Sequence, residues 1–193
     1  MSKAVLISIR PQWCQKIASG EKTIEIRKTR PKLETPFKCY IYCTRDKHLA
    51  FMQNQTGTNL IACMDVDAAI PVGGAIGNGK VIGEFTCDRI DRLTPADEPY
   101  GIYDIGDDYV LQTCLENGAL WDYGHGTPLY GWHISDLRIY DTPKELSEFK
   151  TLCRVDADCC ACPYYNYTKM DCDGRVIGRP PQSWCYVDDV QAK

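Results

Sequence analysis

The sequence has no long hydrophobic run and no excess of basic residues. None of its apolar stretches approaches the roughly 18 residues that a membrane-spanning helix needs. The apolar stretch after Met1-Ser2-Lys3 is too short for a signal peptide, so we expect a cytoplasmic protein without a membrane partner. Its 22 basic and 26 acidic residues give a net charge of −4, which argues against nonspecific binding to phosphates. The basic residues that could form a local patch lie within the first 32 positions: Arg10, Lys16, Lys22, Arg27, Lys28, Arg30 and Lys32.

Internal repeats are also absent, and strands and helices do not alternate strictly along the chain. Residue periodicity predicts strands at 4–10, 23–27, 38–44, 80–91, 130–140 and 179–187. Short helices are expected between Pro11 and Gly20, from Asp107 or Asp108 to Gly118, and from Pro143 to Leu146. This set predicts an α+β fold, a small mixed β-barrel with a few short helices. Residues 45–79 show no sustained period and are interpreted as a long connection with one short helix near Leu49–Met52.

One short segment combines a helix end, a glycine and a strand with a charged face. The period changes to two after Gly20, so Ile24 and Ile26 face one way while Glu25 and Arg27 face the other. Lys22 follows the glycine turn and can reach the same face. A carboxylate, a planar guanidinium and an ammonium suit the edge of a nucleobase and its phosphate. The same three side chains could instead form a surface ion pair of little energetic value.

This segment resembles the Gly-x-Lys-x-x-Glu-x-Arg signature of ASCH domains, through Gly20-Glu21-Lys22-Thr23-Ile24-Glu25-Ile26-Arg27. The lead-in from Ser8 to Trp13 and the later strand Trp132-His133-Ile134-Ser135 are also similar to that family, and the resemblance covers roughly residues 4–149. It implies a PUA-like β-barrel over residues 1–149, with the cleft at the signature. Residues 150–193 would then form a cysteine-rich appendage whose final strand packs on the barrel.

ASCH domains are generally linked to RNA, so the resemblance implies a pocket that binds RNA or a modified nucleoside. The expected ligand-binding residues are Arg10, Lys22, Thr23, Glu25, Arg27, Trp132, His133 and Ser135. Tryptophan faces can stack bases, whereas Trp13 shares an apolar helix face with Ile17 and is expected in the core.

Two enzymatic alternatives remain open at this stage. One bacterial branch of the family resembles an amidohydrolase acting on acetylcytidine, and Lys22 matches its lysine. The position that matches its threonine nucleophile is Glu25, so the chain departs from that pattern. In an enzyme, Lys22 and Glu25 would be the catalytic pair, with Glu25 as general base on water. A metal-free ribonuclease that uses the same two residues is the other alternative.

The twelve cysteines divide into two groups. Six lie singly among apolar residues, where a thiol behaves as a small hydrophobic group: Cys14, Cys39, Cys43, Cys63, Cys87 and Cys114. Cys159 and Cys162 have the spacing of a zinc knuckle, and Cys153 and Cys172 flank them. These four residues predict one structural zinc ion, while a loop of reduced thiols is the alternative.

Overall fold

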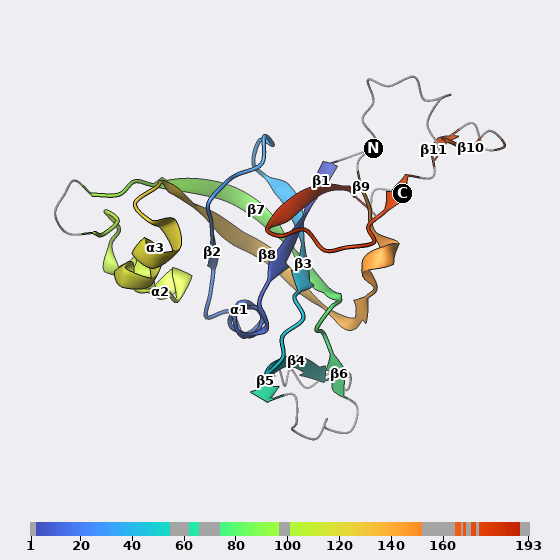
Figure 1. Ribbon diagram of the computed structural model, residues 1–193, viewed down its shortest axis with the longest axis horizontal. Helices are drawn as coiled ribbons and strands as arrows, with labels where there is room; N and C mark the ends of the chain where they lie inside the picture. The colour runs from blue at the N-terminus through green and yellow to red at the C-terminus, as the bar shows by residue number, and fades with distance from the viewer. Residues whose placement is uncertain are drawn as a thin grey trace.

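The computed structural model describes residues 3–54, 62–65, 74–96, 101–151, 165–166, 168, 171–172 and 174–189. Within them, one large sheet is built in the order β12-β9-β13-β1-β3-β7-β8-β2 (Figure 1). Its strands are β1 Lys3–Ile9, β2 Ile24–Arg27, β3 Phe37–Cys43, β7 Val81–Leu93, β8 Leu129–Lys144, β9 Lys150–Thr151, β12 Arg175–Val176 and β13 Trp184–Asp188. Strands β1 and β3 run parallel, and every other neighbouring pair is antiparallel. The α+β class was predicted correctly, as were strands β1, β2, β3, β7, β8 and β13. The helix expected from Pro143 was misplaced, because β8 continues to Lys144 and η1 Leu146–Glu148 begins after it.

The expectation of a closed barrel was wrong, because β12 and β2 are the two edges of an open sheet. The long strands β7 and β8 pair with several register shifts, and such irregularities bend a sheet. This curvature brings β2 back toward β1, where the Arg27 Nη2 donates to the Ser8 carbonyl at 2.7 Å. The Arg27 side chain therefore joins β2 to β1, a strand that already pairs with β13 and β3.

The core lies on both faces of β1, which explains why the consecutive residues 4–7 of this strand are all apolar. Val5, Ile7 and Ile9 belong to one buried cluster, and Ala4 and Leu6 belong to a second. The first cluster also contains four of the predicted core thiols, all of them free: Cys14, Cys39, Cys43 and Cys87. Burial raises the pKa of the Cys14 and Cys39 thiols well above the usual value, so these groups serve packing.

The described helices are short: α1 Pro11–Ala18, α2 Asp107–Thr113, α3 Asn117–Gly124 and the 3-10 helix η1 Leu146–Glu148. Helix α1 was predicted with its proline in the first turn. The single helix expected up to Gly118 is instead two helices, because Cys114 adopts a left-handed conformation with φ of 54° and ends α2. No described helix is long and apolar enough to cross a membrane.

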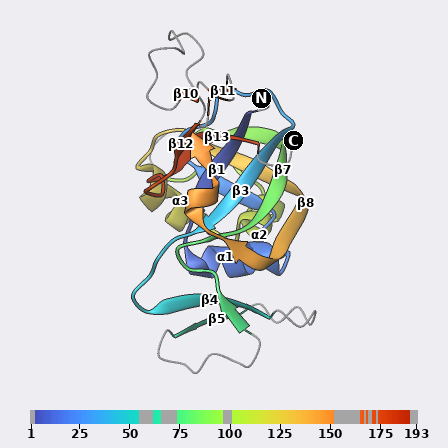
Figure 2. The same ribbon diagram turned by 90° about the vertical axis from the view of Figure 1, so that its right-hand side faces the viewer.

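The 45–79 connection contains strands that the sequence interpretation missed. Strands β4 Leu49–Asn54, β5 Ala62–Asp65 and β6 Gly74–Ile76 form a separate sheet in the order β5-β4-β6, seen below α1 in Figure 2. A strand thus replaces the short helix expected at Leu49–Met52. The Asn78 amide ties this sheet to the following turn, since it accepts from the Phe51 N–H and donates to the Leu49 carbonyl, both at 2.8 Å.

Three of the four predicted zinc ligands, Cys153, Cys159 and Cys162, lie outside the described residues. Cys172 belongs to β11 Asp171–Cys172, which pairs with β10 Tyr165–Asn166. No group of three or more metal-ligating side chains occurs among the residues that the structure describes. The zinc site and the cysteine-rich appendage stay predictions.

Candidate functional site

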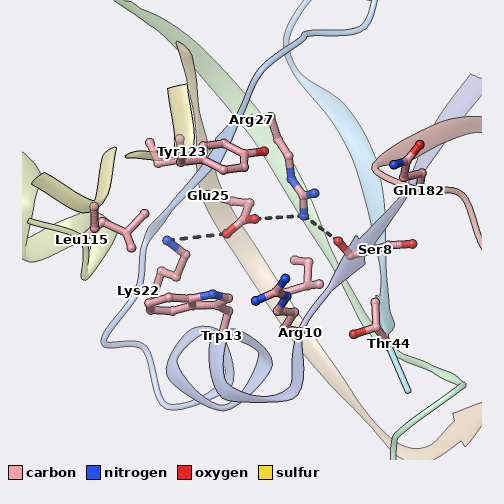
Figure 3. A pocket seen from close by; sticks show the side chains of 13 residues that line it. Ser8, Arg10, Trp13, Lys22, Glu25, Arg27, Thr44, Leu115, Tyr123 and Gln182 are labelled. Carbon is pink, nitrogen blue, oxygen red and sulfur yellow. Dashed lines mark hydrogen bonds and ion pairs between the residues drawn. The ribbon is translucent and has the colours of Figure 1, made fainter. Parts of the chain in front are cut away.

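A pocket of about 420 Å³ opens on the side of the sheet where β2 approaches β1. This volume falls within the roughly 300–1,000 Å³ of typical small-molecule sites. Its walls come from β1, β2, the start of α1 and the α2–α3 region, so segments far apart in sequence meet there (Figure 3). The lining residues are Ser8, Ile9, Arg10, Trp13, Lys22, Glu25, Ile26, Arg27, Thr44, Leu115, Ala119, Tyr123 and Gln182.

The helix-to-strand junction places the charged residues of the pocket. Gly20 has a φ of +80°, a left-handed conformation that glycine adopts without steric cost, and the Lys22 N–H then donates to the Lys16 carbonyl at 2.9 Å. In β2, Ile24 and Ile26 pack into an apolar cluster beneath α3, while Glu25 lines the pocket. Alternation in this short strand thus directs Glu25 and Arg27 to the pocket, as predicted, and Ile26 also contributes to the lining.

Three buried charges form one connected network in the pocket (Figure 3). The Lys22 Nζ lies 3.5 Å from Glu25 Oε2, and Glu25 Oε1 lies 2.9 Å from Arg27 Nη2. The residues Lys22, Glu25 and Arg27 are only 2%, 6% and 8% exposed. A surface ion pair would be solvated and of little value, whereas this network is desolvated and each charge needs its partners.

Lys22 is held by the end of helix α2. Its Nζ donates to the Thr113 carbonyl at 2.5 Å, one of the carbonyls that the last turn of a helix leaves without an intrahelical partner. The Nζ also lies 5.2 Å from the centre of the Trp13 ring, a cation–π distance. Burial lowers the pKa of Lys22, and the Coulombic attraction of Glu25 opposes that shift.

Arg27 retains free hydrogen-bonding capacity in the pocket. Its Nη2 contacts Glu25 and the Ser8 carbonyl, and its Nη1 lies 3.5 Å from the Ser183 hydroxyl. Its Nε is buried and has no acceptor among the described residues. A guanidinium has five N–H donors in one plane, so this side chain can donate to a ligand while it continues to bridge β1 and β2.

Apolar and aromatic side chains line the pocket around the charged network. Leu115, Ala119 and Tyr123 line it from the α2–α3 region, and Trp13 lines it from α1. In Figure 3 the Tyr123 and Trp13 rings lie on opposite sides of the Lys22–Glu25 pair. Burial raises the pKa of the Tyr123 hydroxyl, which therefore stays protonated at neutral pH. A ligand with a flat apolar face and a polar edge fits these walls.

The structure brings four predicted site residues to the pocket and leaves four outside it. Arg10, Lys22, Glu25 and Arg27 line the pocket, whereas Thr23, Trp132, His133 and Ser135 do not. The Thr23 backbone is occupied by hydrogen bonds to Gln112 and Ile134. Trp132 has no exposed surface and belongs to the core.

His133 and Ser135 point to other partners on β7. The His133 Nε2 lies 2.6 Å from the Asp91 Oδ2 and 2.9 Å from the Arg89 Nη2. The Ser135 hydroxyl donates to the Thr86 carbonyl at 3.0 Å. Both side chains thus stabilise the pairing of β7 with β8.

Most of the remaining lining residues were missed by sequence reasoning. Tyr123 could have been found only by placing α3 over the pocket, and Gln182 only by placing the segment before β13 there. Trp13 was assigned to the core, and it does pack partly against it, but its ring also lines the pocket. Ser8, Ile9 and Trp13 did carry a signal, since they belong to the lead-in Ser8 to Trp13 of the ASCH resemblance.

Comparisons with known proteins bear on the fold. No protein-family model and no curated protein matches the sequence. The crystal structure of ASCH from Zymomonas mobilis matches with a TM-score of 0.55 and 18% identity, over 96% of this chain and 88% of that chain. The structure of one mutant of that protein matches with a TM-score of 0.51 and 19% identity, over 97% of this chain and 92% of that chain. The structure of a second mutant matches with a TM-score of 0.52 and 18% identity, over 96% of this chain and 89% of that chain. The chain therefore has the fold of an ASCH domain, as its Gly-x-Lys-x-x-Glu-x-Arg segment indicated.

Proposed function

We propose that the pocket binds one nucleoside unit, either within RNA or as a modified nucleoside. The observation that supports this most is the buried network of Lys22, Glu25 and Arg27 at the base of a cavity with aromatic walls. A nucleobase has a flat face that stacks on aromatic rings and an edge that carries donors and acceptors. Trp13 and Tyr123 suit the face, and the charged network suits the edge.

The charge balance of the pocket is consistent with this ligand class. Lys22, Arg27 and the exposed Arg10 supply three cations, and among the described residues that line the pocket Glu25 alone carries a carboxylate. The excess of positive charge favours a ligand that carries a phosphate. The ASCH fold supports the same proposal, since the domains that the sequence resembles are generally linked to RNA.

We expect the double variant Lys22→Ala/Arg27→Ala to bind a labelled ten-nucleotide RNA of randomised sequence on the order of 100-fold more weakly than the parent protein, since charge-assisted hydrogen bonds contribute roughly 1.5–3 kcal/mol each. Tyr123→Ala keeps the ionic network intact and should weaken binding about tenfold through the loss of one stacking surface. Fluorescence anisotropy measures both affinities.

The control for this binding experiment is Thr23→Ala/Ser135→Ala, which changes two predicted residues that lie outside the pocket. Circular dichroism of every variant checks that it is folded. Unchanged RNA and nucleoside binding in both pocket variants would place the binding site elsewhere and contradict the proposal.

A second candidate function is hydrolysis of an amide on a modified nucleoside such as acetylcytidine. The observation that favours it is the lowered pKa of Lys22, which burial causes and which is common in active sites. Glu25 would activate a water molecule, and Lys22 or Arg27 would stabilise the oxyanion. The oxygen of the attacking water adds to the acyl carbon, the C–N bond breaks, and the proton that the water loses moves to the leaving amine.

Mass spectrometry of modified nucleosides incubated with the protein separates the two functions. The labelled ten-nucleotide RNA is incubated with the protein in parallel. If the pocket only binds, the parent protein forms no product from the nucleosides and the RNA stays intact. Product that forms with the parent but not with Glu25→Gln, under conditions where circular dichroism shows the variant to be folded, would establish hydrolysis. Cleaved RNA with the same dependence on Glu25 would instead establish the ribonuclease alternative.

A further inference from the structure

The segment after β2 displays three cations at the surface. Lys28, Arg30 and Lys32 are all exposed, and none of them forms an ion pair with a carboxylate in the described part of the chain. The chain as a whole carries a net charge of −4, so this cluster of positive charges is opposite in sign to the net charge. Unpaired cations of this kind create a local positive potential.

The backbone that carries these cations is fixed in position. The Trp184 indole N–H donates to the Thr29 hydroxyl at 3.0 Å, and the Tyr186 hydroxyl accepts from the Lys32 N–H at 2.7 Å. Both aromatic residues belong to β13, and Pro31 between the cations is buried. The segment therefore presents its charges from a defined path between β2 and β3 (Figure 1).

The positive surface begins at the mouth of the pocket. Lys28 directly follows Arg27, and its Nζ lies 5.0 Å from the centre of the Tyr123 ring, which lines the pocket. Arg30 and Lys32 continue the charge along the chain away from the pocket. A nucleoside that fills the pocket would leave these two side chains without a role, whereas a strand that enters the pocket with one base would bring phosphates to them.

We propose that Lys28, Arg30 and Lys32 form a phosphate-binding strip that holds the backbone of a single-stranded RNA next to the pocket. The proposal rests on the proposed function of the pocket and makes its preferred ligand a strand of several nucleotides. Positive grooves that follow the backbone beside a base-stacking site are the general solution for single-stranded nucleic acids. The strip contributes affinity without reading sequence, while the pocket selects the base.

The variant Arg30→Glu/Lys32→Glu tests the strip and leaves every lining residue of the pocket in place. Its affinity for the labelled ten-nucleotide RNA is expected to fall at least about tenfold. The slope of log affinity against log salt concentration should become shallower by about 1.4, since each phosphate contact on a single strand contributes roughly 0.7. The affinity for a single nucleoside, measured with acetylcytidine and the unmodified nucleosides, should not change.

The matched control is Arg138→Glu/Lys144→Glu, which makes the same change in charge on β8, at residues that do not line the pocket. It should leave both the affinity and the salt slope close to those of the parent. Equal RNA binding by the strip variant and the parent would overturn the strip and leave the pocket proposal intact. If the parent protein binds nucleosides but not RNA, the strip proposal is also overturned. A parent that binds neither would contradict the proposed function itself.

Discussion

Glu25→Gln is expected to lower the free energy of unfolding by about 3–5 kcal/mol at neutral pH, although it preserves the size of the side chain. The Glu25 carboxylate lies between the buried cations Lys22 and Arg27. Removing one member of a buried charge network leaves the other charges desolvated without compensation, which costs far more than breaking a surface pair. Urea denaturation followed by tryptophan fluorescence measures the loss.

The loss of stability in Glu25→Gln should depend on pH in one direction. Burial already lowers the pKa of Lys22 in the folded protein, and Glu25 raises it, so the substitution lowers it further. The unfolded state then binds more protons than the folded state between the folded pKa and the unfolded value of about 10.5. Stability of the variant therefore rises with pH through that window, and its deficit relative to the parent protein should shrink between neutral pH and pH about 10.

A comparison with an exposed ion pair separates burial from charge alone. Glu21 pairs with Lys16 at 3.4 Å on the surface beside α1, so Glu21→Gln should leave the free energy of unfolding nearly unchanged. Lys22→Met/Glu25→Gln should recover part of the stability that Glu25→Gln loses, because it removes the unpaired lysine as well. Equal losses for Glu25→Gln and Glu21→Gln would show that the network does not stabilise the fold.

The buried network shows how far sequence reasoning reaches at this site. Alternation in β2 predicts that Glu25 and Arg27 share a face, because side-chain direction in a strand has a fixed period. It does not predict that this face is desolvated. Burial of Arg27 depends on the Ser8 carbonyl, which lies 19 residues earlier in the chain, and on the curvature of β7 and β8. A surface pair and a buried network therefore look identical in the sequence.

Contacts between segments far apart in the sequence also explain the errors in the fold prediction. Strand count and length predicted the α+β class, but closure of a barrel is decided by whether the edge strands β2 and β12 pair, a contact that periodicity does not encode. The sheet of β4, β5 and β6 was missed because residues 45–79 show no sustained alternation of apolar and polar residues. Helix α3 was missed because the pattern before it predicted one longer helix, and Tyr123 was lost from the site with it.

Trp132→Ala is expected to lower the free energy of unfolding by about 3–5 kcal/mol, the usual cost of truncating a fully buried aromatic side chain. Trp132 has no exposed surface. Its ring centre lies 5.9 Å from those of both Phe37 and Trp184, and no collapse of these neighbours alone fills the space that it leaves. Trp184 occupies a half-buried position of the same cluster, so Trp184→Ala should lower the free energy of unfolding by less than Trp132→Ala.

Two further measurements distinguish a core residue from a ligand-stacking residue at position 132. The Trp132 Nε1 is buried without an acceptor among the described residues, so Trp132→Phe removes an unsatisfied donor and should be markedly less destabilising than Trp132→Ala. Under conditions where the variants remain folded, both should bind the ten-nucleotide RNA close to parent affinity, since the ring does not line the pocket. Weakened RNA binding by a stable Trp132→Phe would place this ring in contact with the ligand, and the pocket would then have to open toward β8 when it binds.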